Sequence, residues 1–350
     1  MKLRSITIRN FKRFVAKQKF EFFSENDPDS NKILILGNNG TGKSSILQAI
    51  VLITALATRD RFTPEDVNWP GFDFRHAQIG KMPIAITCDY LFSDEEVSAT
   101  RKYAERLIVS GIALELPSTD KEVSLRFNPK NDYISASKSK SRLYQFSGYQ
   151  YAKQLSKNTK NKSELFDKVG NIYWYDEQRT SASTSNMIDS SSQDLDDVRA
   201  FLSSAYTYHI AVTEKGREIR EGEFDFYESI HTLYRKVFPS RSFIGSAPRF
   251  DVYEKADVPD FFLFDGKNQY ELGEMSAGER AVFPILMDFA RWNINNSIII
   301  IDEIELHLHP PLQQALIRVL DELGNDNQFI ITSHSNSVAA MFDEAQIIRL

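Results

Sequence analysis

The stretch KILILGNNGTGKSSILQAI, residues 32 to 50, constrains the fold of this chain more than any other. A short apolar run precedes a glycine-rich loop, and an amphipathic helix follows it, which fits the pattern G-x-x-x-x-G-K-[ST] in its required setting. Glycines at 37, 40 and 42 let backbone N–H groups converge on phosphate oxygens, and the helix turns its positive N-terminal end toward the same anion. We therefore expect an α/β fold in which a strand–loop–helix unit binds a nucleotide.

Each position of this loop has an expected role with ATP. Lys43 should reach the β- and γ-phosphates and act in catalysis, and the hydroxyl of Ser44 should hold Mg²⁺. The other contacts should come from the loop backbone and its small side chains. The expected nucleotide-binding residues of the loop are Asn38, Asn39, Gly40, Thr41, Gly42, Lys43, Ser44 and Ser45.

A second signal is the run SIIIIDE, residues 297 to 303. Four consecutive isoleucines are typical of a central parallel strand that is buried on both faces. Asp302 and Glu303 follow at its carboxyl end, where open α/β sheets place their ligand sites. We expect Asp302 to hold Mg²⁺, directly or through water, and Glu303 to orient and deprotonate the attacking water. Without the phosphate loop, the same pair would be read as solvated acids at a strand end.

The segment NQFIITSHS, residues 327 to 335, predicts a further strand that ends at His334. One helix, over about residues 312 to 323, separates it from the isoleucine strand. This β–α–β order brings the two strand ends side by side, so we expect His334 to reach the γ-phosphate and the catalytic water. His307 and His309 have the spacing of metal ligands but no third ligand is placed with them, so we assign them a structural or subunit-contact role.

The N-terminal segment alternates apolar residues from Leu3 to Ile8 with basic ones and turns at Asn10. Residues 1 to 50 carry nine Lys and Arg against four acids. Two interpretations fit this pattern equally well. One is a solvated edge strand, and the other is a strand whose following turn places Lys12 or Arg13 near the nucleotide phosphates.

The stretch MSAGER, residues 275 to 280, indicates the start of a helix. Ser276 would be the N-cap, and Glu279, three positions later, would close a capping box. Alone, this stretch predicts no chemistry.

Five motifs together resemble ABC-type ATPase heads, and more narrowly the SMC-like and OLD-like (overcoming lysogenisation defect) ATPases of bacteria, which include ATPases of anti-phage systems. In chain order the motifs are IRNFKRF, GNNGTGKSS, MSAGER, IIIIDEIELHLHP and IITSHS. They frame essentially the whole chain, and they are specific for fold and ATP chemistry but only weakly specific for biological role. The resemblance implies a P-loop NTPase of the ABC-ATPase type, with a mostly parallel sheet core, an antiparallel β subdomain and a helical insert.

The same resemblance implies a working dimer. Two chains would sandwich two Mg·ATP, with Ser276 and the backbone of Gly278 of each chain capping the γ-phosphate bound by its partner. Higher oligomers are compatible with this arrangement. Met275 stands where the signature usually has Leu, and Ile304 stands where many relatives have Pro. The sequence has no heptad run long enough for a coiled-coil arm and no Cys hook, which argues against an SMC-type tether. We also expect no OLD-type nuclease domain in this chain.

We expect residues 1 to 350 to form a single head, in which 1–60 and 271–350 make the nucleotide-binding core. Residues 61–270 should hold the β subdomain and a helical, basic insert. The elements expected in this middle part are strands over 84–92 and 123–127, a helix over 227–239, a hairpin over 261–272 around Asp265 and Gly266, and a flexible Ser-rich loop over 181–197.

The strand NIYWY, starting at residue 171, is followed closely by Gln178. In the ABC heads that this chain resembles, a glutamine after such a strand contacts Mg²⁺ and water. Gln178 is therefore the candidate for both nucleotide and metal contact, and Gln145 and Gln150 compete with it for that role.

Residues 121 to 170 carry eleven Lys and Arg against four acids, and the aromatic residues interleaved with them include Tyr133, Tyr144, Phe146, Tyr149, Tyr151 and Phe166. Basic and aromatic residues together suit contact with DNA or RNA, while a solvated insert fits the same composition. Lys138, Lys140 and Arg142 are the cations whose reversal should test nucleic-acid contact.

The whole-chain composition excludes several classes of protein. A net charge of −6 means that any nucleic-acid contact must come from a local patch. The single cysteine, Cys88, rules out a disulfide framework or a Cys-based zinc site within one chain. No apolar run is long enough for a membrane span and no signal peptide is recognisable, so we expect a cytoplasmic protein.

Two functions from different classes remain open. The chain is either a defence or DNA-maintenance ATPase whose turnover senses or remodels nucleic acid, or an ATP-gated scaffold that holds or releases an effector such as a nuclease or toxin with slow hydrolysis. A transporter ATPase fits poorly, because the N-terminal strand and the ELHLHP segment look unlike that branch.

Overall fold

The computed structural model shows two compact units, each assembled from segments that are distant in the sequence. It describes residues 1–23, 31–79, 81–129, 133–159, 163–179, 194–247, 258–292 and 294–350. The first unit comprises Met1–Glu177, Asn293–Ile304 and Leu323–Leu350, and the second comprises Gln178–Trp292 and Glu305–Glu322. The domain boundaries expected at residues 60 and 270 stay a prediction.

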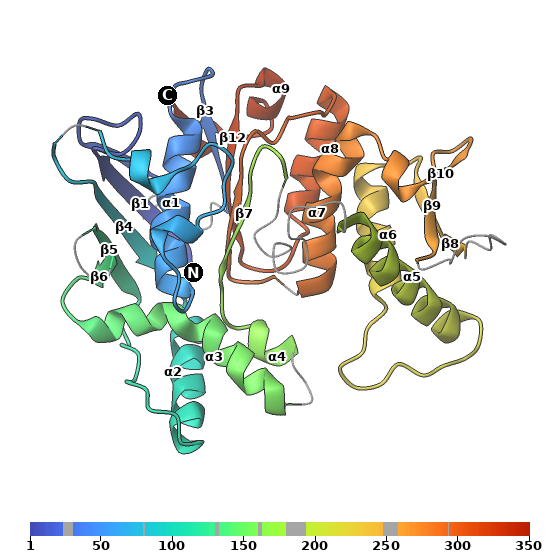
Figure 1. Cartoon of the computed structure of the whole chain (residues 1–350), viewed down its shortest axis with the longest axis horizontal. Coiled ribbons are helices and arrows are strands. Elements are labelled where there is room, and N and C mark those ends of the chain that lie inside the picture. The colour runs from blue at the N-terminus through green and yellow to red at the C-terminus, as the bar shows by residue number, and fades with distance from the viewer. Residues whose placement is uncertain are drawn as a thin grey trace. The chain divides into compact units, whose positions relative to one another are not determined.

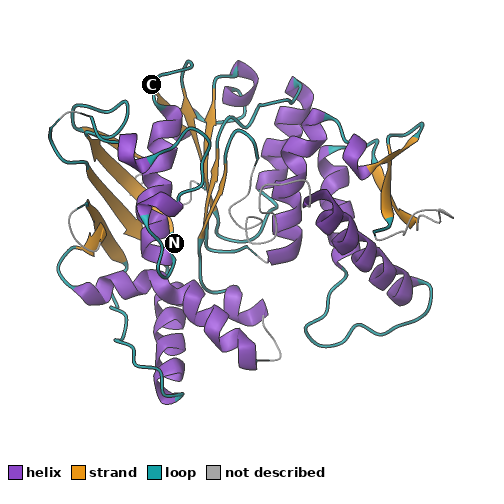
Figure 2. Cartoon of the chain, viewed as in Figure 1, coloured by secondary structure: helices purple, strands orange, loops and turns teal. Residues whose placement is uncertain are grey.

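A five-stranded, all-parallel sheet forms the centre of the first unit (Figure 2). Its strand order is β13-β3-β12-β11-β7, and every residue of β7, β11 and β12 is buried, which is why these strands read as continuous apolar runs. The strands expected around residues 33–36, 297–303 and 327–335 are confirmed. Their bounds are β3 Lys32–Leu36, β7 Ile172–Tyr175, β11 Ile298–Ile301, β12 Gln328–Ser333 and β13 Ile347–Arg349.

A second, antiparallel sheet of the same unit has the order β2-β1-β4-β5-β6. The edge-strand interpretation of the N-terminal segment is wrong, because β1 pairs with β2 on one side and with β4 on the other. The two strands expected over 84–92 and 123–127 are confirmed as β4 and β5. The bounds are β1 Lys2–Arg9, β2 Gln18–Glu21, β4 Ala85–Leu91, β5 Glu122–Asn128 and β6 Tyr133–Ala136.

Helix α1 (Lys43–Thr58) packs between these two sheets and contacts strands of both (Figure 1). Almost all of its side chains are buried, so the helix is enclosed on all sides and is not the amphipathic helix that the sequence predicted. Because α1 starts at the last residues of the glycine-rich loop, the core holds the loop at the carboxyl end of β3.

The rest of the first unit is mainly helical. Helices α2 (Asp94–Val109), α3 (Gly148–Leu155) and α4 (Ser163–Phe166) share an apolar cluster that includes Tyr103 and Tyr151. The helical part of the predicted insert therefore has its own core. The short elements of this unit are α9 Asn336–Ala339 and 3-10 helices over Pro64–Asp66, Phe74–His76, Lys140–Ser147, Ser156–Asn158 and Glu344–Gln346.

The second unit packs helices against a three-stranded antiparallel sheet with the order β10-β9-β8. The predicted helix over 227–239 and the predicted hairpin are confirmed, and Gly266 supplies the positive φ of 96° in the hairpin turn. The flexible loop expected over 181–197 lies outside the described residues up to 193, and helix α5 already begins at Asp194. The bounds are α5 Asp194–Thr213, α6 Phe226–Val237, α7 Ala277–Trp292, α8 Pro310–Leu320, β8 Ser242–Ala247, β9 Asp260–Phe264, β10 Gln269–Glu271 and a 3-10 turn over Leu272–Glu274.

Within the described residues, no helix combines the length and the apolar character that crossing a bilayer requires.

Candidate nucleotide-binding site

The glycine-rich loop has the backbone geometry of a phosphate cradle. Gly40 and Gly42 have φ angles of 80° and 109°, which L-residues rarely adopt. A Cβ added at Gly42 would also lie 3.0 Å from the Phe14 ring. The Nζ atom of Lys43 donates to the carbonyls of Gly37 at 2.8 Å and Asn38 at 3.1 Å, so the loop holds its own cation in place.

A cavity of about 160 Å³ opens at this loop. It brings together distant parts of the chain, because Arg13 from the turn after β1 and Glu303 from the end of β11 join the loop around it. Its lining residues are Arg13, Asn39, Gly40, Gly42, Lys43, Ser44, Ser45 and Glu303.

Arg13, and not Lys12, faces the phosphate loop. A Cβ added at Gly40 would lie 3.6 Å from Nη2 of Arg13. Lys12 instead donates to Oε1 of Gln48 at 2.8 Å, and burial lowers its pKa. The sequence did not decide whether Lys12 or Arg13 would lie near the phosphates, and the structure places Arg13 at the cavity.

Asp302 and Glu303 are tied together by a residue of the neighbouring strand. Asp302 is only 2 % exposed, and its Oδ1 accepts the hydroxyl of Thr332 at 2.5 Å. The oxygen of the same hydroxyl accepts the backbone N–H of Glu303 at 2.8 Å. Ile301 pairs with Ile331 across the parallel strands, so the next residue on each strand comes to the same sheet edge. Sequence reasoning missed Thr332, and the only signal for it was its place beside Asp302 in the β–α–β unit.

Glu303 has a left-handed backbone, with a φ of 45°. A non-glycine residue pays for this conformation in strain, and such strain concentrates at functional sites where the surroundings enforce it. Here the N–H of Glu303 is held by Thr332, and the N–H of Ile304 donates to the carbonyl of Thr332 at 3.2 Å. The side chain of Glu303 is thereby turned to the cavity that it lines.

The predicted glutamine follows the neighbouring strand β7. Gln178 is an exposed turn residue three positions after β7 and belongs to the second unit. Of its competitors, Gln145 is buried, and Gln150 donates to the carbonyl of Thr58 at 3.3 Å. The role of Gln178 stays a prediction. Sequence reasoning passed over Asp176, which is fully buried directly after β7, the strand that pairs with β11.

The histidines after the sheet are exposed. His334 directly follows β12, and β12 lies beside β11 as predicted, but His334 is not among the described residues that line the cavity. Its contact with the γ-phosphate stays a prediction. His307 and His309 are exposed on either side of buried Leu308, and no group of three or more His, Cys, Asp or Glu suited to a metal occurs in the described part of the chain.

The capping box expected in MSAGER is confirmed. Helix α7 begins at Ala277, the N–H of Glu279 donates to Oγ of Ser276 at 3.3 Å, and the N–H of Ser276 donates to Oε2 of Glu279 at 2.8 Å. Ser276 is exposed, whereas Gly278 is buried with its Cβ position 3.0 Å from the carbonyl oxygen of His307. The described geometry thus presents Ser276 at the exposed start of a long helix.

Comparison with known proteins supports a nucleotide-binding role for this site. The family described as "AAA domain, putative AbiEii toxin, Type IV TA system" matches residues 33–340. The chain belongs to this family. As an AAA-family protein with an intact phosphate loop, it is an ATPase.

Two curated relatives of this AAA-family chain are retron proteins. It is 22% identical to the "Retron Vc95 probable ATPase" of Vibrio cholerae serotype O1 biovar El Tor, over 99% of this chain and 73% of that protein. It is 32% identical to the "Retron Ec83 probable ATPase" of Escherichia coli, over 34% of this chain and 23% of that protein.

Solved SMC heads share the fold. An SMC head bound to the C-winged helix domain of ScpA has a TM-score of 0.52 at 16% identity, covering 100% of this chain and 94% of that one. A Pyrococcus furiosus SMC head bound to the C-terminal domain of ScpA has a TM-score of 0.53 at 14% identity, covering 99% and 92%. These likenesses confirm an SMC-like, ABC-type ATPase fold for the AAA-family chain.

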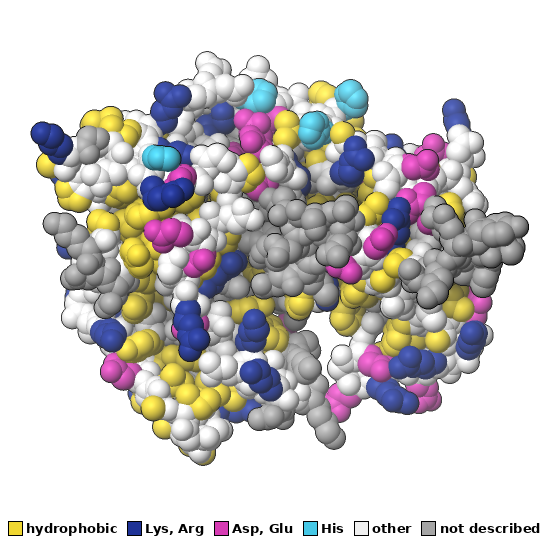
Figure 3. Space-filling model, in the orientation of Figure 1, with side chains coloured by type: hydrophobic (Ala, Val, Ile, Leu, Met, Phe, Trp, Pro, Cys, Tyr) yellow, Lys and Arg dark blue, Asp and Glu magenta, His cyan; other side chains and the backbone are white. Residues whose placement is uncertain are grey.

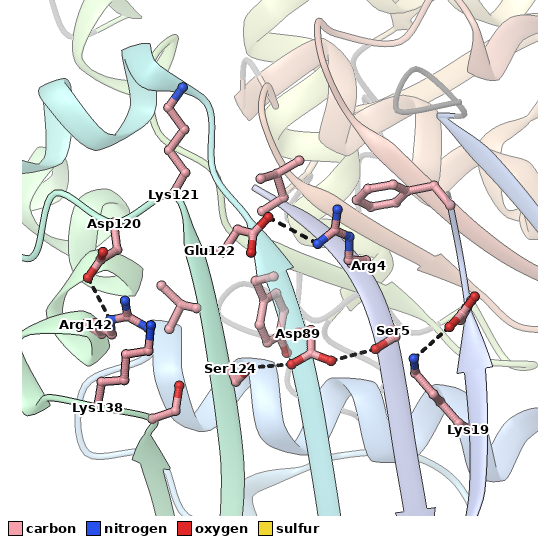
Figure 4. Close-up of a pocket in the computed structure, with 16 residues that line it drawn as sticks. Arg4, Ser5, Lys19, Asp89, Asp120, Lys121, Glu122, Ser124, Lys138 and Arg142 are labelled. Carbon is pink, nitrogen blue, oxygen red and sulfur yellow. Dashed lines mark hydrogen bonds and ion pairs between the residues drawn. The ribbon is translucent and has the colours of Figure 1, made fainter. Parts of the chain in front are cut away.

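A larger hollow, of about 950 Å³, lies over the antiparallel sheet, and most of its charges are paired (Figure 4). Arg142 donates to Asp120 at 2.7 Å, and Arg4 donates to Glu122 at 3.1 Å. Lys19 pairs with Glu21 in the same way, at 2.6 Å. Among the cations named for the nucleic-acid test, Lys138 and Lys140 are exposed, but Arg142 is buried in an ion pair.

The aromatic residues of the basic segment are not exposed stacking surfaces. Phe127, Phe146 and Tyr151 are buried, and Tyr133, Tyr144, Tyr149 and Phe166 are partly buried. On the face shown in Figure 3, Lys and Arg side chains are interspersed with Asp and Glu. In its described part, the segment 121 to 170 therefore presents exposed cations but no fully exposed aromatic side chain beside them.

Proposed function

We propose that this chain binds and hydrolyses Mg·ATP in the cavity at the phosphate loop. The observation that carries the proposal is the convergence of Arg13, Lys43, Ser44 and Glu303 on one cavity. The loop backbone from Asn38 to Ser45 would surround the phosphates, and Arg13 and Lys43 would neutralise their negative charge.

The donor set fits a magnesium ion. Mg²⁺ prefers hydroxyl, carboxylate and water oxygens, and Ser44 and Asp302 provide the first two. Gln178 is the further ligand we propose. When bound, Mg²⁺ would draw charge from the phosphate oxygens and so assist departure of the terminal phosphate.

The chain's own residues would then prepare the water. Glu303 would accept a hydrogen bond from the attacking water and take its proton, and His334 would contact the γ-phosphate and the same water. Thr332 would keep the carboxylate of Asp302 and the backbone of Glu303 at a constant separation. The strained backbone of Glu303 supports this role, because it aims the side chain at the cavity.

We propose that two copies act together. The exposed Ser276 and the N-terminus of α7 would cap the γ-phosphate held by the partner subunit, with the backbone of Gly278. ATP would favour the closed dimer, and loss of the γ-phosphate would loosen it. The Glu303→Gln variant should therefore accumulate as an ATP-bound dimer in sizing chromatography. A variant that binds ATP but stays monomeric would refute the sandwich.

We propose that the closing and loosening are relayed to a partner effector protein in anti-phage defence, within the cytoplasm. The retron ATPases among the relatives support the defence setting. The packed aromatic residues and the ion pair that occupies Arg142 favour a protein partner over DNA or RNA. Slow hydrolysis that times the release of such an effector is the form of coupling we favour.

Coupling to DNA or RNA is the second candidate, and the exposed Lys138 and Lys140 are the observation that favours it. DNA maintenance would then be the setting. Stimulation of the ATPase by nucleic acid, lost on Lys138→Glu and Lys140→Glu, separates this candidate from the first.

A further inference from the structure

Arg241 is placed beside the exposed serine of MSAGER. It lies in the turn between α6 and β8, and its guanidinium packs over the Phe238 ring at 5.4 Å. Its Nη1 forms an ion pair with Glu279 and donates to Oγ of Ser276 at 3.4 Å. The side chain of Arg241 is 27% exposed, whereas that of Glu279 is 1% exposed. A cation thus reaches solvent at the start of α7 with a buried carboxylate behind it.

Glu279 is held by an unusually complete set of donors. The hydroxyls of Tyr234 and Tyr270 donate to its Oε1, and the hydroxyl of Ser276 donates to its Oε2 at 2.7 Å. Burial raises the pKa of Glu279, but the hydrogen bonds from Arg241, the two tyrosines and Ser276 outweigh it and lower this pKa to about 2. Glu279 is therefore a permanent anion near neutral pH.

The negative charge of Glu279 disfavours binding of the phosphate that Ser276 is proposed to cap. The only hydroxyl proton of Ser276 is donated to Glu279, so the serine cannot donate it at the same time to a phosphate oxygen. A carboxylate directly behind the serine also repels an approaching phosphate. In the described structure, Arg241 is the group that offsets this charge and still reaches the surface beside Ser276.

We propose that Arg241 is a phosphate ligand supplied in trans, which contacts the γ-phosphate held by the partner subunit while Glu279 acts as its positioning residue. This inference rests on the proposed ATP-sandwich dimer. A guanidinium offers several N–H donors in a planar fork, so it can keep its bond to Glu279 and still donate to phosphate oxygens. Ser276 then serves mainly to fix the start of the helix, and Arg241 supplies the charge.

The test uses the full chain in the Glu303→Gln background, where ATP is expected to hold the dimer. The double change Arg241→Met/Glu279→Gln removes both charges, so it leaves no unpaired buried ion. We expect it to stay folded at the assay temperature and to bind a fluorescent ATP analogue as a protomer as tightly as the parent does. We expect its ATP-dependent dimerisation, measured by sedimentation, to weaken about tenfold or more, as for loss of a charge-assisted hydrogen bond.

A double variant that dimerises as tightly as its parent would overturn the proposal, because Arg241 would then only neutralise Glu279. Arg241→Lys provides a second arm, since it keeps the charge and the ion pair but loses the fork. It should weaken dimerisation several-fold without changing the melting temperature, and an unchanged dimer would contradict the phosphate contact even if the double variant failed to fold. The parent separates the two proposals: a monomeric parent contradicts the sandwich itself, whereas equal dimers in parent and variants contradict only the role of Arg241.

Discussion

The hydroxyl of Thr332 lies 2.5 Å from Oδ1 of Asp302, and this bond joins the carboxyl ends of the neighbouring parallel strands β12 and β11. Because the same hydroxyl oxygen accepts the N–H of Glu303, one side chain sets the positions of both acids. The proposed metal ligand and the proposed base therefore cannot move independently.

Removing this hydroxyl should impair hydrolysis more than binding. We expect Thr332→Val to lower kcat about ten- to a hundredfold and to cost about 1–3 kcal/mol of stability, because the buried carboxylate of Asp302 and the N–H of Glu303 each lose one hydrogen bond. Thr332→Ser keeps the hydroxyl and should retain most of the activity. Steady-state ATPase assays and urea unfolding of both variants check this, and a Val variant with wild-type kcat would contradict it.

The two basic residues after β1, Arg13 and Lys12, provide a test substitution and its control. Arg13→Ala should lower kcat/KM for ATP at least about tenfold, since a charge-assisted contact with phosphate is lost. Lys12→Ala should have a much smaller effect, because Lys12 is engaged with Gln48 and does not line the cavity. Equal losses from the two substitutions, measured by ATP turnover, would show that Arg13 has no special place in the site.

The Glu279 network predicts a specific loss of stability in acid. The pKa of Glu279 is about 2 in the fold against an ordinary 4.5, so the unfolded chain binds the proton more readily. Its contribution is fully present above pH 4.5 and is lost as the pH falls toward 2, by at most about 3 kcal/mol. Urea unfolding at stepped pH should show this slope in the wild type and a shallower one in Glu279→Gln. Identical slopes would refute it.

The sequence predicted the parallel core well because its signals are local. A buried parallel strand is an unbroken apolar run, and a phosphate loop is a contiguous pattern, so β3, β11, β12 and the start of α1 could be assigned from residues close in the chain. The inner position of β1 in the antiparallel sheet could not be assigned in this way. It depends on pairing with β4, and the alternation of apolar and polar residues is the same in an inner strand as in an edge strand.

The side-chain contacts of the site were less accessible. Thr332, Arg241 and Tyr270 reach their partners only through strand pairing or tertiary packing, and no spacing along the chain announces them. Arg142 shows the converse error, because a cation in a basic segment looked available but is paired with Asp120. Composition reports how many charges a segment has, and the fold decides which of them are already neutralised.

Nucleic acid should have little influence on this enzyme. We expect added DNA or RNA to change the ATPase rate less than about twofold at physiological salt, since counterion release needs several unpaired cations on one surface. Lys138→Glu with Lys140→Glu should likewise leave the rate unchanged. A clear stimulation that these reversals abolish would favour the nucleic-acid candidate over the effector-protein one.

Mixing two inactive variants tests the shared site most directly. Lys43→Ala disables the phosphate loop of its own chain, and Ser276→Ala together with Arg241→Met/Glu279→Gln disables the surface offered to the partner. In a mixed dimer, one of the two sites combines an intact loop with an intact capping surface. If the site is shared, the mixture should regain about a quarter of the wild-type ATPase rate, since half of the random dimers are mixed and each holds one complete site of two. A mixture no more active than the two variants measured separately would contradict it.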